Sequence, residues 1–176
     1  MKIGHLALAC LAMSTLVSCS SSAEEPIPER ICGTPVDADL VRPLLEPLGK
    51  IDEYNEVDRK TAKTAPCLIL VDEKATLRFR FSWHGGAVDP VKKATSIDSV
   101  ITLNDPARAD IGYNAAVGSD GAIATTACRT SGGDHFTLSL LLPRAPKNDK
   151  DTRTAIEAFM RAYMRETVKT LGCAKA

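Results

Sequence analysis

The sequence predicts an α+β fold in which an antiparallel sheet of five or six strands has helices packed on one face and is stapled by two disulfides. Side chains from Leu77 to His84 alternate between apolar and polar, as expected of an antiparallel strand that is buried on one side. Apolar residues between Asp151 and Leu171 recur with a period of 3.6, which indicates an amphipathic helix. An even number of cysteines follows residue 19, and together these patterns lead to the predicted class.

The first nineteen residues predict export followed by lipid attachment. Lys2 is followed by an apolar run from Ile3 to Val17, which is the layout of a secretory signal peptide. The run is shorter than the roughly twenty residues that a membrane-spanning helix needs. It ends in Leu16-Val17-Ser18-Cys19, which resembles a bacterial lipobox, where the cysteine becomes the first mature residue and carries the lipid. The alternative is ordinary signal-peptide cleavage that leaves Cys19 as a thiol.

We therefore expect a signal peptide at 1–18, a lipidated Cys19 with a flexible tether at 19–31, and a single α+β domain at 32–176. Residues 20–31 are small, acidic and proline-bearing without an apolar period, which is typical of a tether. With Lys2 removed, the mature chain is close to neutral, so an anionic membrane surface would not attract it. The lipid on Cys19 would then supply the attachment.

Elements within the domain follow from local patterns. Asp37 precedes a leucine-rich segment that Gly49 ends, which predicts a short helix, and Asp89-Pro90 opens a helical turn. Residues 50–66 are polar and predicted to be irregular. The segment 67–71 is apolar on both faces and forms a hairpin with the strand after it, and Asp120-Gly121 predicts a second hairpin turn. The predicted strands are 67–71, 77–84, 97–103, 111–117, 122–128 and 136–142, and the predicted helices are a short one within 37–48 and a long one at 151–171.

Four cysteines remain after Cys10 in the signal peptide and Cys19 at the lipobox. In an exported chain an even count predicts disulfides, and four cysteines allow three pairings. We favour Cys32–Cys67 and Cys128–Cys173, because each pair then brackets one compact unit. Each would close a loop of tens of residues, worth roughly 3–4 kcal/mol in the chain-entropy model.

A metal site is the rival use of these cysteines. The sequence has no C-x-x-C motif, and His84 and His135 lie far from any cysteine along the chain. No Asp-x-Asp-x-Asp-Gly series predicts calcium binding either. We expect no metal and no cofactor.

Charge gives one candidate binding surface. The chain has 22 basic and 22 acidic residues and 5% aromatic residues, so neither a basic field nor stacking platforms predict nucleic-acid binding. Arg78, Arg80 and His84 share the polar side of the predicted strand 77–84 and form a modest basic stripe. This stripe could meet an anionic partner such as a phosphate-bearing wall polymer, and the alternative is a solvated face.

Catalytic motifs are not found. The sequence has no Gly-x-Ser-x-Gly elbow, His-Glu-x-x-His helix or Ser-x-x-Lys motif. The most enzyme-like string is Ser82-Trp83-His84-Gly85-Gly86, and Asp134-His135 lies at another turn. If the sheet brought His84 and His135 together, they could form a small polar site, so we keep an envelope hydrolase as an alternative. Most aspartates fall at turns and helix starts, where they accept hydrogen bonds from the backbone.

The lipobox ending at Cys19, the serine-rich tether and the opening Ile31-Cys32-Gly33-Thr34 before a helix are similar to small, uncharacterised secreted lipoproteins of actinobacteria. The layout also resembles the two-disulfide extracellular sensor domains of mycobacterial serine/threonine kinases, although this chain has a lipobox instead of a kinase and a membrane helix. The resemblance implies a lipid-anchored protein on the extracytoplasmic face of the cell membrane, and it carries over no catalytic residue.

Our leading hypothesis is a non-catalytic binding or accessory module of the cell envelope, with an envelope protein as the favoured partner. The hydrolase would need His84 or His135 to converge with a carboxylate or a serine inside a pocket. A third alternative, a carrier of a lipid or small ligand, would need an apolar cavity beneath Ile156, Met160 and Met164.

Overall fold

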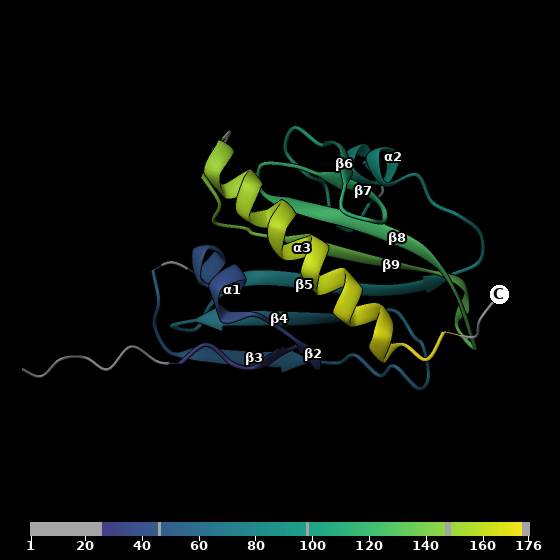
Figure 1. The fold of residues 1–176 in the computed structure, drawn as a ribbon, viewed down its shortest axis with the longest axis horizontal. Coiled ribbons are helices and arrows are strands. Elements are labelled where there is room, and N and C mark those ends of the chain that lie inside the picture. The colour runs from purple at the N-terminus through teal and green to yellow at the C-terminus, as the bar shows by residue number, and fades with distance from the viewer. Residues whose placement is uncertain (1–25, 46, 98, 147–148, 174–176) are drawn as a thin grey trace, which may run out of the picture.

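A computed structural model describes residues 26–45, 47–97, 99–146 and 149–173; the expected signal peptide at 1–18 and Cys19 lie outside the described residues. Within that part of the chain, the centre of the fold is a seven-stranded antiparallel sheet with the order β3-β4-β5-β9-β8-β7-β6 (Figure 1). Its strands are β3 (Ile51–Asn55), β4 (Ala65–Val71), β5 (Lys74–His84), β6 (Ala107–Asp110), β7 (Asn114–Val117), β8 (Gly121–Thr130) and β9 (Gly133–Leu141). A separate two-stranded sheet joins β1 (Arg30–Ile31) to β2 (Thr34–Pro35).

The long C-terminal helix supplies most of one layer. Figure 1 shows α3 (Lys150–Thr170) lying diagonally across the sheet, with α1 (Ala38–Leu45) beside it. The predicted apolar stripe of this helix is its buried face, and Phe159 and Tyr163 pack against Phe79 of β5 at centroid distances of 6.1 and 5.0 Å. The Asp149 carboxylate accepts hydrogen bonds from the backbone of Asp151 and Thr152 and so caps the start of α3.

The remaining helix, which follows β5, packs on the other face of the sheet. Helix α2 (Pro90–Thr95) follows the Asp89 cap as predicted. Its Ala94 packs in a second small core with Ile123 of β8, whereas the neighbours of Ile123 along β8 belong to the main core under α3. Because successive strand side chains point to opposite faces, α2 packs on the face away from α3. The expectation that all helices lie on one face is therefore not confirmed.

The sheet is larger than the predicted five or six strands. The polar segment 51–55 forms β3, which pairs with β4 and was missed because its side chains are half-buried or exposed and show no apolar alternation. Of the predicted strand 111–117, only 114–117 is a strand, β7. Residues 111–113 form the turn that joins it to β6, a strand the sequence patterns did not predict, and Gly112 adopts a positive φ of 81° in that turn.

The predicted strand at 97–103 was wrong. Its described residues lie outside the sheet, with Ile97 97% exposed. Ile101 and Leu103 instead pack with Ala94 in the second core, and the Leu103 N–H donates to the Ala94 carbonyl. The apolar side chains of this segment are therefore buried against α2, and its backbone does not pair with a strand.

Both favoured disulfides are confirmed: Cys32–Cys67 joins the β1–β2 turn to β4, and Cys128–Cys173 joins β8 to the residue that follows the last turn of α3. The second bond therefore clamps the end of the helix to the sheet, as expected.

The folded unit begins earlier than the predicted residue 32, because Arg30 and Ile31 form β1 and Ile31 is fully buried. The tether predicted for 19–31 is thus shorter by at least its last two residues.

Candidate functional site

Strand β5 brings the predicted basic stripe to one face of the sheet. Phe79, Phe81 and Trp83 point into the main core, so the residues between them point the other way. Arg78 is exposed, and Arg80 and His84 are half-buried. The structure therefore places all three residues on one side, opposite α3; their role in binding stays a prediction.

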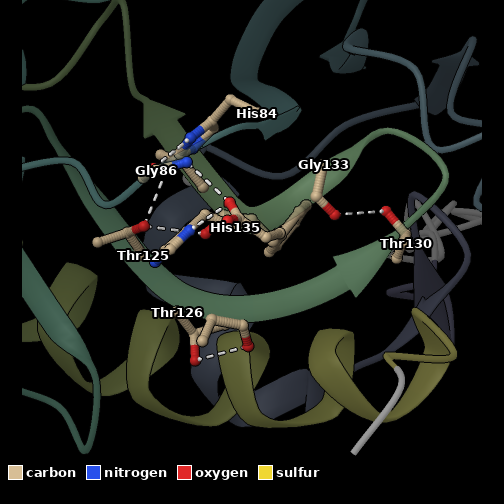
Figure 2. A network of polar contacts seen from close by, with 11 residues as sticks. His84, Gly86, Thr125, Thr126, Thr130, Gly133 and His135 are labelled. Atoms are coloured by element: carbon tan, nitrogen blue, oxygen red, sulfur yellow. Dashed lines mark hydrogen bonds and ion pairs between the residues drawn. The ribbon is translucent and has the colours of Figure 1, made fainter. Parts of the chain in front are cut away.

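The sheet also brings the two histidines together. β5 and β9 are antiparallel neighbours whose register sets His84 directly opposite His135. The rings stack with centroids 6.2 Å apart and an interplanar angle of 14°, on the side of the sheet away from α3 (Figure 2). Gly133 permits this approach, because a Cβ there would lie 2.3 Å from the His84 carbonyl oxygen. Sequence patterns could not specify this pairing, because strand order decides it.

His84 is held at both ring nitrogens. Its Nδ1 lies 3.0 Å from the Gly86 carbonyl oxygen, and its Nε2 lies 2.8 Å from Oγ1 of Thr137 (Figure 2). The Thr137 hydroxyl also lies 3.1 Å from that of Thr125 on β8. Burial lowers the pKa of His84, because desolvation disfavours the charged ring and outweighs the hydrogen bond to Gly86.

His135 makes a separate set of contacts. Its Nδ1 donates to Oδ1 of Asp134 at 2.7 Å, and the same carboxylate oxygen accepts from the Gly86 N–H at 2.7 Å. The hydrogen bond from His135, followed by that from Gly86, lowers the pKa of the Asp134 carboxyl. Asp134 thereby ties the glycine loop after β5 to the start of β9.

These contacts do not form a hydrolytic triad. A nucleophile needs a base beside it, and that base needs an orienting group. Thr137 has a base beside it but is 0% exposed, so substrate cannot reach its hydroxyl. The carboxylate of Asp134 orients His135, whereas His84 faces a carbonyl. The two halves of a triad therefore lie on different histidines.

The surface hollows of the domain do not add a substrate pocket at the histidines. Four of the hollows among the described residues have volumes from 170 to 460 Å³, and neither histidine lines any of these four. The carrier alternative lacks support for a related reason. Ile156, Met160 and Met164 are each 0% exposed in a packed core, and none of the three lines one of these hollows.

One cluster of a carboxylate and two cysteine sulfur atoms has the spacing of a metal site. Ligand atoms of Cys32, Glu53 and Cys67 lie within 4.8 Å of one another. The two sulfur atoms are bonded to each other, and Oε2 of Glu53 accepts a hydrogen bond from the Cys32 N–H at 2.7 Å. With these atoms already engaged, the cluster serves to hold the β1–β2 turn on the sheet.

Arg59 is the functional-looking residue that sequence reasoning missed, because it falls in the segment predicted to be irregular. Its guanidinium lies 5.1 Å from the centroid of the Phe81 ring and donates to the Cys32 carbonyl at 2.6 Å. Its Nε donates to Oγ1 of Thr170 near the end of α3 at 2.9 Å. Desolvation lowers the Arg59 pKa, and every one of these contacts is internal. The residue therefore joins the N-terminal turn to α3, and it also lines one of the surface hollows, beside Thr130 and Thr170.

The pKa direction of His84 gives a pH prediction. The unfolded ring, with a pKa of about 6.5, binds a proton more readily than the folded ring. The stability that His84 contributes should be complete above that pH and decline as the pH falls toward the lower folded pKa. Urea unfolding between pH 5 and pH 8 of wild type and His84→Gln measures this.

The difference in unfolding free energy between the two proteins isolates His84 from the other titrating groups near it, which are His135, Lys93 and Asp134. We expect this difference to shrink with acidification. A difference that grows below pH 6.5 would show that the folded ring holds its proton more tightly and would contradict the assignment.

Comparison with known proteins gives no match to a protein-family model, to a curated protein or to a solved structure. In the part of the chain that the structure describes, no helix combines the length and the apolar character needed to cross a membrane.

Proposed function

We propose that the protein is a lipoprotein attached through Cys19 to the extracytoplasmic face of the cell membrane, where its domain acts as a non-catalytic binding or accessory module of the envelope. The proposal joins the lipobox-like sequence Leu16–Cys19 with the chemistry of the folded part. An envelope component, not a nucleic acid, is the proposed partner.

The observation that carries the non-catalytic role is the geometry at the histidines. The fold brings His84, His135 and Asp134 together, yet the hydroxyl that lies beside a histidine nitrogen in the described part of the chain, that of Thr137, is fully buried. The open sheet surface on the same side carries Arg78, which is exposed, and Arg80, which is half-buried. Such a surface favours recognition over chemistry.

Two further features support the proposed location. Both disulfides suit an oxidising compartment outside the cytoplasm, because intracellular reductants keep thiols reduced. A diacylglyceryl cysteine carries at least two acyl chains, which is enough for stable attachment, whereas one chain is marginal.

Labelling with radioactive palmitate tests the attachment. Wild type should incorporate label and sediment with membranes, whereas Cys19→Ala should lose the label and leave the membrane fraction. Cys10→Ala, within the expected signal peptide, is the matched control and should label normally. Equal labelling of wild type and Cys19→Ala would reject the anchor.

A further inference from the structure

The sheet has an open surface on the side opposite α3, made of β3, β4 and β5. None of the described helices covers it: α1 and α3 pack into the main core, and α2 packs against β6, β7 and β8. The side chains at its centre belong to one group, which we call the outer face: Tyr54, Pro66, Leu68, Arg78 and Arg80.

The outer face carries two arginine cations on neighbouring outward positions of β5. In the described residues, neither Arg78 nor Arg80 forms an ion pair or a side-chain hydrogen bond. They are two residues apart on one side of a strand, so their Cα atoms are about 6.5 Å apart. At the margin, Asp52 pairs with Lys50 at 2.9 Å, whereas Glu56 keeps its charge and accepts a hydrogen bond from the neutral hydroxyl of Tyr54. Of the five side chains of the outer face, the charged ones are the two arginines, so its β5 side is positive.

Apolar groups surround these cations. Register places Arg78 between Leu68 of β4 and Leu141 of β9, and Arg80 between Pro66 and Ser139. Beyond Leu68 in the same row lies Tyr54, whose side chain is 50% exposed although it is large and aromatic. The face thus combines guanidinium groups with a half-buried apolar strip.

We propose that the outer face binds an anionic polymer whose sugar or polyol units are linked by phosphodiesters. Guanidinium groups bind phosphate oxygens in a bidentate manner, and two of them at this spacing suit phosphates repeated along a flexible chain. The CH faces of sugar or polyol units can lie on the tyrosine and the apolar strip. Arg78 and Arg80 line none of the four hollows described above and lie on an open sheet face, which suits an extended polymer better than a small molecule. This inference rests on the proposed binding role outside the membrane.

Binding of a fluorescently labelled synthetic poly(glycerol phosphate) to the full mature protein in zwitterionic detergent tests the proposal. Arg78→Ala/Arg80→Ala should bind at least about tenfold more weakly than wild type, because two charge-assisted contacts are lost. Wild-type binding should weaken as salt rises from 50 to 200 mM, and the double variant should show a smaller salt dependence.

Arg129→Ala/Arg144→Ala is the matched control, since it removes two exposed arginines from other places and makes the same change in net charge. It should bind like wild type. Equal loss in both double variants would show attraction by net charge alone and would overturn the site. Arg78→Gln/Arg80→Gln removes both charges but keeps much of each side-chain stem, so it should lose binding as the double alanine variant does. Near-UV circular dichroism verifies that each double variant is folded before its binding is measured.

Two other probes separate the polymer from other anions. Tighter binding of poly-glutamate would point to an acidic protein segment, and co-sedimentation with phosphatidylglycerol vesicles in preference to the polymer would point to the membrane surface. Either result would overturn the proposal. Failure of all binding would reject the ligand class, while palmitate labelling at Cys19 would still report separately on the anchor.

Discussion

Replacing both Cys128 and Cys173 by serine is expected to lower the free energy of unfolding by about 4 kcal/mol. The bond closes a loop with a sequence separation of 45 residues, and the chain-entropy model assigns this cost to the freedom that the unfolded chain regains. The described part of α3 ends close to Cys173, so the helix also loses its covalent link to β8. Urea unfolding of wild type and variant measures the change.

The Cys32–Cys67 bond is the matched comparison. Its separation of 35 residues predicts nearly the same loss, because loop entropy depends only on the logarithm of length. Adding a reductant to wild type should destabilise it by at least as much as either serine pair does. Unchanged unfolding after loss of Cys128–Cys173 would mean that this bond constrains nothing in the unfolded chain.

Phe79→Ala is expected to lower the unfolding free energy by about 3–5 kcal/mol. The Phe79 side chain is 1% exposed and lies between the sheet and α3, with Phe159 and Tyr163 against its ring. Truncation removes buried apolar surface and leaves a cavity that the strand and the helix cannot close without moving. Chemical denaturation monitored by far-UV circular dichroism gives the value.

The neighbouring residue supplies the control for this prediction. Arg78 is exposed on the other side of β5, so Arg78→Ala should change stability by no more than about 0.5 kcal/mol. The pair therefore tests which side of the strand faces the core. Similar losses from both substitutions would contradict the assigned alternation of β5.

Local sequence signals predicted the parts of the fold that depend on local physics. Alternation from Leu77 to His84 and the 3.6 period from Asp151 are direct consequences of one buried face, and β5 and α3 follow them. The hairpin between β4 and β5 turns at Asp72 and Glu73, both at positive φ, a conformation that aspartate tolerates better than glutamate does. Compact bracketing also predicted both cysteine pairings correctly.

The wrong secondary-structure predictions concern segments whose conformation depends on contacts with residues distant in the sequence. β3 is mostly polar, without apolar alternation, and is a strand because β4 offers an unpaired edge beside it. Ile101 and Leu103 look like strand residues, yet α2 offers them a core on the second face. Such choices depend on tertiary contacts, which a residue pattern does not contain.

The sequence predicted which candidate site residues share a face of the strand, but not which of them meet across strands. That Arg78, Arg80 and His84 share one face follows from strand alternation alone. The contact between His84 and His135 depends on β9 lying next to β5, and the burial of Thr137 depends on the surrounding side chains. Arg59 gave no signal, because its partners lie 27 and 111 residues away along the chain.

Mass analysis of the mature protein's N-terminal peptide, recovered from membranes and digested without reductant, tests the location and the covalent framework at once. The account predicts a first residue of Cys19 bearing a diacylglyceryl group, in a molecule whose other peptides are joined as 32–67 and 128–173. A soluble protein that begins at Met1 and has free thiols at those four positions would contradict it.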